Sequence, residues 1–187
     1  CWDAPLTGPE DFDTGSFSMR EIERVLSAAI RKSEVTGVSV LPYSGCSHWA
    51  ISRSILGLPR VGEFDSEDVP FPLTFGKEFT GAASAEVHPA VAMYYWLGKD
   101  FRKYKGAASK KEREEAVWHN FTELLKVDAL NAYNPGKELY SDDELDAFVA
   151  YALGRLWLDG EKVFQLGNER AGAMLLPRSA EKVTISV

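Results

Sequence analysis

Residues 141–156 constrain the fold more than any other part of this sequence. Ser141 with Glu144 three residues later forms a capping box, which predicts that a helix begins here with two aspartates in its first turn. Apolar residues then recur at spacings of three and four, typical of a helix face that packs on a core. This stripe consists of Leu145, Phe148, Val149, Ala152 and Leu156. The rest of the fold must therefore provide an apolar surface that covers it.

The composition is that of an ordinary globular protein. The 187 residues are 45% hydrophobic and 26% charged, so we expect a single domain over residues 1–187. No stretch approaches the roughly 18 apolar residues of a membrane span, and no signal peptide is evident. With two cysteines only, we expect a cytoplasmic protein without a membrane partner. The sequence leaves the oligomeric state unknown.

Helical and strand patterns alternate along the chain, which predicts an α/β fold. Apolar residues at helical spacing occur over residues 18–31, 90–97 and 110–126, besides the helix over 141–156. Short apolar runs that end at glycine or proline predict strands over residues 82–87, 162–166 and 172–176. A last strand is expected over residues 182–187.

Two carboxylates on the 141–156 helix are candidate metal ligands. Asp143 and Asp146 are three residues apart, which places their β-carbons about 5 to 6 Å from one another on one helix face. Such a pair suits a hard divalent cation. The helix dipole alone explains an acidic residue at position 143, but Asp146 lies beyond the first turn, where neither capping nor the dipole explains it.

One segment is basic although the chain carries a net charge of −7. Residues 99–113 contain seven of the 21 lysines and arginines. The acidic total excludes a surface that is phosphate-binding throughout, so any nucleic-acid contact must be local. Lys103 and Lys105 are the candidate substrate-binding residues, and a solvated helix start is the alternative explanation of this segment.

Six short motifs together resemble one family. They are Trp2-Asp3-Ala4-Pro5-Leu6, the Glu86 to Ala90 segment EVHPA, Tyr104-Lys105-Gly106, the Asp142 to Ala147 segment DDELDA, Leu166-Gly167-Asn168 and the Gly172 to Pro177 segment GAMLLP. In this order they resemble the domain of unknown function 429 family (DUF429), a family of predicted nucleases with an RNase H-like fold. The DxxDA helix is also similar to the last catalytic helix of Holliday-junction resolvases.

The resemblance implies a central mixed sheet with flanking helices and a metal site for Mg²⁺ or Mn²⁺. Carried over residue by residue, Asp3 takes the fourth-strand ligand position, and Asp143 and Asp146 take the late-helix positions. Glu86 is expected as an additional ligand or polar neighbour, and His88 could assist proton transfer. The first-strand aspartate of the family pattern would precede residue 1, so we expect that upstream strands are missing.

These inferences predict a divalent-metal-dependent nuclease. Phosphodiester hydrolysis by this fold class needs carboxylates that hold divalent cations, and no side-chain nucleophile. The catalytic carboxylates would be Asp3, Glu86, Asp143 and Asp146. Two alternatives remain: a non-catalytic module of the same fold that binds nucleic acid or another partner, and an amidohydrolase that uses Cys1 as an amino-terminal nucleophile.

Overall fold

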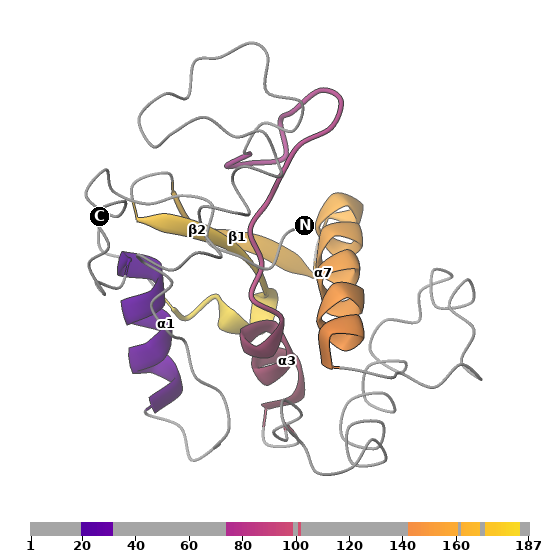
Figure 1. The fold of residues 1–187 in the computed structure, drawn as a ribbon. Coiled ribbons are helices and arrows are strands. Elements are labelled where there is room, and N and C mark those ends of the chain that lie inside the picture. The colour runs from indigo at the N-terminus through magenta and orange to yellow at the C-terminus, as the bar shows by residue number, and fades with distance from the viewer. Residues whose placement is uncertain are drawn as a thin grey trace, which may run out of the picture.

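The computed structural model describes residues 20–31, 74–98, 101, 142–160, 162–168 and 171–183. Helices α1 (Glu21–Arg31), α3 (Pro89–Leu97) and α7 (Asp142–Asp159) lie around strands β1 (Val163–Asn168) and β2 (Gly172–Pro177), which the short 3₁₀ helix η4 (Arg178–Ala180) follows (Figure 1). The three predicted helices and two predicted strands in these ranges are confirmed. The strand predicted over residues 82–87 is present only as bridge residues at positions 84, 86 and 87. Residues 182–183, the start of the predicted last strand, form no strand, because the chain turns after η4 and the Val183 N–H donates to the Ala180 carbonyl at 2.9 Å. The predicted helix over residues 110–126 and residues 184–187 lie outside the described residues.

Strands β1 and β2 form an antiparallel hairpin whose turn depends on glycine. The register runs from Val163 opposite Pro177 to Asn168 opposite Gly172. Gly167 and Gly172 have φ angles of +99° and +83°, which side chains with a β-carbon rarely adopt. The Asn168 Oδ1 atom accepts a hydrogen bond of 2.9 Å from the Ala171 N–H and closes the turn.

A third segment pairs with the other edge of β2. Val87 and Leu175 form a parallel bridge, and the Leu175 N–H donates to the Glu86 carbonyl at 2.9 Å. Strand β2 therefore lies between the antiparallel β1 and the parallel segment around Glu86. The described sheet is this two-stranded antiparallel hairpin with one parallel bridge beside it, and together with the helices it fits the α/β class.

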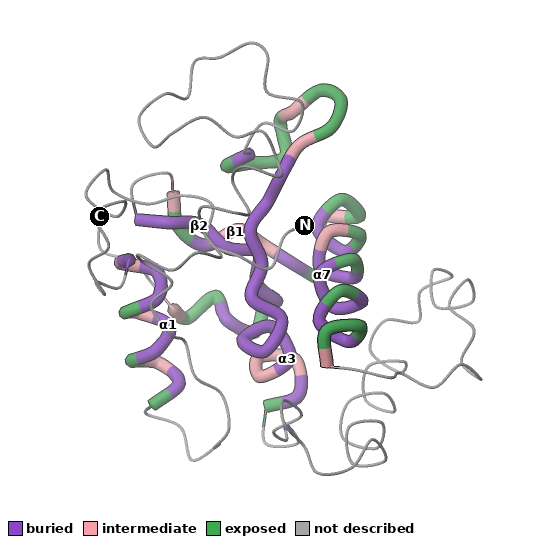
Figure 2. The backbone as a smooth tube through the Cα atoms, viewed as in Figure 1, coloured by how far each residue is buried: buried purple, intermediate pink, exposed green. Residues whose placement is uncertain are grey.

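Helices cover both faces of β2. Every residue of this strand is buried, as the continuous purple of β2 in Figure 2 shows. Leu175 belongs to a hydrophobic cluster with α3 and α7, whereas Met174 and Leu176 belong to a second cluster with α1. Because successive side chains of a strand point to opposite faces, α7 covers one face of β2 and α1 covers the other.

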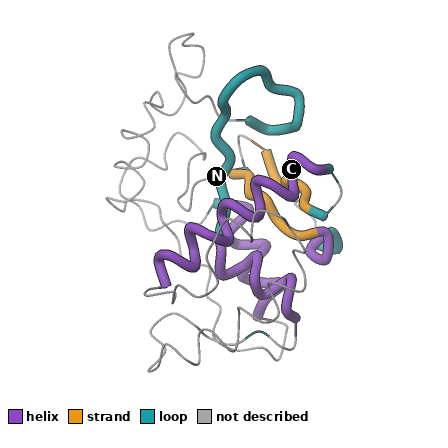
Figure 3. The backbone as a smooth tube through the Cα atoms, turned by 90° about the vertical axis from the view of Figure 1, so that its right-hand side faces the viewer, coloured by secondary structure: helices purple, strands orange, loops and turns teal. Residues whose placement is uncertain are grey.

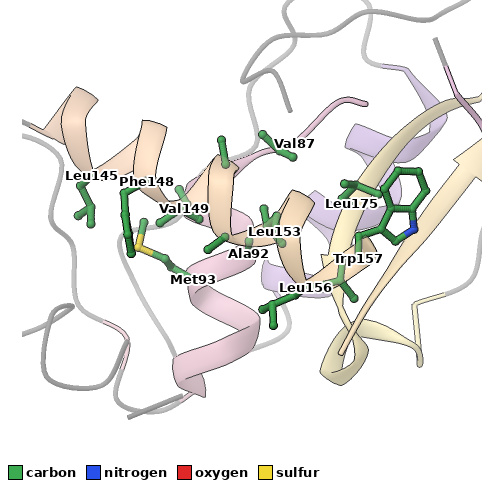
Figure 4. Close-up of a cluster of buried hydrophobic side chains, with 14 of the residues drawn as sticks. Val87, Ala92, Met93, Leu145, Phe148, Val149, Leu153, Leu156, Trp157 and Leu175 are labelled. Atoms are coloured by element: carbon green, nitrogen blue, oxygen red, sulfur yellow. The ribbon is translucent and has the colours of Figure 1, made fainter. Parts of the chain in front are cut away.

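Helix α7 packs through the stripe that the sequence predicts. Leu145, Phe148, Val149, Ala152 and Leu156 are all buried. Figure 4 shows Val149 and Leu153 of α7 beside Ala92 and Met93 of α3. Helix α3 contributes to both clusters, and its apolar residues lie on all sides, as expected for a helix inside a core.

The aromatic residues at the end of α3 also pack in this interior. Tyr94, Tyr95 and Trp96 are half-buried against the two clusters. Tyr94 makes an edge contact with Phe101 at a ring-centroid distance of 6.1 Å. Burial raises the pKa of Tyr95 to about 12, and neighbouring Tyr94 adds to this shift.

A loop over residues 75–83 extends from the sheet and is visible in teal at the top of Figure 3. Its base is closed by a hydrogen bond of 2.9 Å from the Thr74 N–H to the Ser84 carbonyl. Phe79 stacks on Trp157 of α7 with ring centroids 6.0 Å apart, and the Lys77 Nζ atom donates to the Gly160 carbonyl at 3.0 Å. These contacts join the loop to the end of α7.

None of the described helices is both long enough and apolar enough to cross a membrane.

Truncation of Leu153 tests the packing of α7. Its side chain has no exposed surface, so Leu153→Ala leaves a cavity and is expected to lower the free energy of unfolding by about 3 kcal/mol. The matched control on the same helix is Tyr151→Ala, because Tyr151 is 55% exposed and its loss should change stability by about 0.5 kcal/mol or less. Urea denaturation followed by circular dichroism measures both. Equal losses in the two variants would contradict this assignment of the buried face.

Candidate functional site

Helix α7 places its two candidate ligands in different environments. Asp146 is buried, with 6% of its surface exposed, between the core residues Leu145 and Val149. Asp143, one turn earlier, is exposed to solvent. The two carboxylates therefore differ in exposure, because the boundary between core and solvent runs between them. Asp146 is the one that the fold takes into its interior.

Glu86 forms an ion pair with Arg20, on the opposite side of the sheet from α7. The Arg20 Nη1 atom donates to Glu86 Oε2 at 2.7 Å, and Nη2 donates to Oε1. This is the two-pronged geometry in which a planar guanidinium binds a carboxylate most strongly. Both oxygens of Glu86 therefore accept from the same arginine.

A second carboxylate completes this group. The Nε atom of Arg20 donates to Glu23 Oε1 at 2.8 Å, and the backbone N–H of Arg20 donates to Glu23 Oε2 at 2.9 Å. Arg20, Glu23 and Glu86, together named the Arg20 cluster, are exposed by only 2%, 0% and 3%. Burial alone lowers the pKa of the Arg20 guanidinium, but the carboxylates of Glu86 and Glu23 outweigh it and raise that pKa above its ordinary value. The arginine is therefore charged at neutral pH.

Gly172 provides the space in which the guanidinium lies. A β-carbon at this position would be 2.8 Å from Cγ2 of Ile22 and 3.1 Å from Nη1 of Arg20. The Ile22 N–H also donates to the Ala171 carbonyl at 3.1 Å, which joins the start of α1 to the hairpin turn. The Arg20 cluster is thus the point where α1, the Glu86 segment and the start of β2 meet.

Strand alternation explains why Glu86 faces α1. Its neighbours Ala85 and Val87 belong to the cluster on the α7 side of the sheet. Since side chains alternate, Glu86 points to the other face, where Arg20 lies. Asp146 belongs to α7, so the structure does not place Glu86 and Asp146 on the same face of the sheet.

Sequence reasoning missed Arg20 and Glu23. The local signal is an arginine with a glutamate three residues later at the start of a helix, which predicts an exposed ion pair at most. Nothing local indicates Glu86, which lies 66 residues further along the chain. Only the packing of α1 on the sheet brings these groups together.

His88 lies at the junction between the sheet and α3. It is buried and occupies the N-cap position of α3 in an extended conformation, without a capping hydrogen bond from its side chain. Its predicted role in proton transfer stays a prediction. The other candidates, Asp3, Lys103, Lys105 and Cys1, lie outside the described residues.

The described residues alone do not form a metal cage. Within the described ranges no three histidine, cysteine, aspartate or glutamate side chains form a group that could hold a metal ion. Asp143 and Asp146 still fit as part of a site, because Mg²⁺ is commonly bound by one or two carboxylates that water and substrate phosphates supplement. Glu86 is held differently, since both of its oxygens accept from Arg20 on the α1 side of the sheet.

The fold and the candidate site together define an α/β protein with helices on both faces of a small sheet and a carboxylate pair at the start of its late helix. The family model described as "Protein of unknown function (DUF429)" matches residues 77–170, half of the chain. The chain therefore belongs to the DUF429 family, which confirms the resemblance carried by its sequence motifs. Searches of curated proteins and of solved structures returned no match.

Substitution of Gly172 tests how tightly Arg20 is enclosed. Gly172→Ala combines a positive φ angle with overlap against Ile22 and Arg20, whereas Gly81→Ala at a φ of +78° meets no atom within 4 Å. We expect Gly81→Ala to cost about 1 kcal/mol for backbone strain alone. Gly172→Ala should cost roughly 1 to 3 kcal/mol more through overpacking. Chemical denaturation of both variants gives the difference, and an equal loss in the two would show that the space at Gly172 is not limiting.

Proposed function

We propose that this chain is a divalent-metal-dependent nuclease on an RNase H-like fold, with Mg²⁺ or Mn²⁺ as its cofactor. The described sheet supports the fold assignment in two ways. It combines antiparallel and parallel pairing around β2, and it has α1 on one face and α7 on the other. Both features belong to a central mixed sheet with flanking helices.

The burial of Asp146 is the observation that carries the proposal. An opposite charge within about 4 to 6 Å favours the charged form of a buried carboxylate, so a cation beside Asp146 would be stabilised there. Asp146 lies among the buried residues of α7, one helical turn from the exposed Asp143. A bound cation would contact Asp143 on the side that faces solvent and Asp146 on the side that faces the core.

The residues of this chain have distinct roles in the proposed site. Asp143 and Asp146 would hold the cation together with Asp3, the ligand that the family resemblance implies. The chemistry that Mg²⁺ or Mn²⁺ supplies when bound is activation of water and stabilisation of the leaving oxygen. Lys103 and Lys105 would contact substrate phosphates, an interaction that weakens as salt is added.

Calorimetric titration with Mn²⁺ tests the proposal. The parent chain is expected to bind Mn²⁺, and Asp146→Asn should lose roughly tenfold or more of the affinity because it removes a ligand charge. The matched control is Asp159→Asn at the other end of α7, where an exposed aspartate pairs with Arg155 at 3.3 Å. This control should keep the parent affinity.

Cleavage assays on labelled single-stranded DNA, duplex DNA and RNA then identify the substrate. Asp146→Asn should reduce the Mg²⁺-dependent cleavage rate by roughly tenfold to a hundredfold, and Asp159→Asn should not. Absence of Mn²⁺ binding in a correctly folded parent chain would refute the metal site. Metal binding without cleavage would favour the binding-module alternative.

A further inference from the structure

We propose that Glu86 is not a ligand of the proposed metal site, because Arg20 holds its carboxylate on the other side of the sheet. Glu86 instead anchors α1 to the sheet, and the cation ligands are Asp143, Asp146 and Asp3. This inference rests on the proposed function, because it concerns which carboxylates hold the cation. Glu86 would thereby differ in role from Asp143 and Asp146, although the family motifs predict all three as catalytic carboxylates. The same geometry assigns Arg20 as the residue that determines where the Glu86 carboxylate lies.

The contacts of Glu86 give the first argument. Both of its oxygens accept hydrogen bonds from the two Nη atoms of Arg20, and the whole group is buried. To turn toward a cation at Asp143 and Asp146 on the α7 side of the sheet, Glu86 would have to give up this charge-assisted pair. Breaking it would leave Arg20 with a partly uncompensated charge in the interior, which is strongly unfavourable.

The position of Glu86 gives the second argument. Ala85 and Val87 on either side face the cluster that includes α7, so the carboxylate of Glu86 faces α1. The Glu86 carbonyl meanwhile accepts from the Leu175 N–H in the sheet, which fixes the backbone at this residue. Glu86 would need to reverse its side-chain direction to join Asp146 at one cation.

Glu23 holds Arg20 from the side of its own helix. Its carboxylate accepts from Nε and from the backbone N–H of Arg20, so the arginine is bound by a carboxylate on each side. Nη2 of Arg20 also lies 2.8 Å from Glu23 Oε1. Two carboxylates hold one guanidinium, and through it α1 is fastened to the Glu86 segment.

Thermal unfolding tests the anchor without any metal. Arg20→Met leaves two carboxylates buried without their partner, so the midpoint should fall by roughly 6 to 20 °C. The control is Arg24→Met, because Arg24 is mostly exposed and pairs with Glu21 at the surface, where the loss should be about 3 °C or less. Arg20→Lys, which keeps the charge but not the planar fork, should lie between them. Equal midpoints for Arg20→Met and Arg24→Met would overturn the anchor.

Mn²⁺ titration tests the exclusion of Glu86. The triple variant Arg20→Met, Glu23→Gln, Glu86→Leu replaces the charges while residue 23 keeps an acceptor for the backbone N–H. Such replacements are often neutral for stability, so this variant is expected to fold, and its Mn²⁺ affinity should stay within about twofold of the parent. Glu86→Gln alone should behave in the same way where it folds. A tenfold loss of Mn²⁺ affinity in the folded triple variant would show that Glu86 is a ligand and would overturn the proposal.

The proposed function and the proposed role of Glu86 can be refuted separately. If the parent chain binds no Mn²⁺, the proposed function fails, yet the unfolding midpoints still decide whether Arg20 anchors Glu86. If Mn²⁺ binds and Asp146→Asn abolishes binding, the triple variant decides the role of Glu86 directly.

Discussion

The buried guanidinium of Arg20 is the interaction on which the arrangement of the described elements depends. A charge without contact with water is tolerated only when it is paired and fully hydrogen-bonded, and Arg20 meets that condition through Glu23 and Glu86 together. One partner belongs to its own helix and the other to the sheet. The pairing with Glu86 therefore cannot form unless α1 lies correctly on the sheet, and a misplaced helix would separate Arg20 from Glu86.

Strand alternation determines on which side of the sheet each acidic side chain lies. Because β2 is buried on both faces, each neighbouring strand must send alternate side chains into one core or the other. On the Glu86 segment, this rule sends Ala85 and Val87 toward α7 and the carboxylate toward α1. The sheet thus separates Glu86 from Asp146, although the family resemblance predicts both as residues of one site. The α1 side carries the Arg20 cluster, and the α7 side carries the larger hydrophobic cluster together with the carboxylate that the proposed function needs.

Local signals account for most of the described fold. The capping box and stripe predicted α7, and the glycine and proline boundaries predicted the hairpin, because helix periodicity and turn geometry depend on residues close in sequence. Burial of Asp146 could be suspected from its position beyond the first turn. The Arg20 cluster could not be predicted, since its partners are 66 residues apart and meet only through tertiary packing. Asp3, Lys103 and Lys105 remain predictions, since they lie outside the described residues.

The contrast between Asp143 and Asp146 gives the proposed site its physical logic. A carboxylate in solvent can capture a cation and exchange it, but water competes for the ion and weakens the attraction. A carboxylate at the edge of the core has a lower local dielectric, so its attraction for a cation is stronger. One helical turn supplies both, because the solvent boundary of α7 passes between the two residues. A single helix that crosses from solvent into the core can therefore provide both capture and precise placement of one ion.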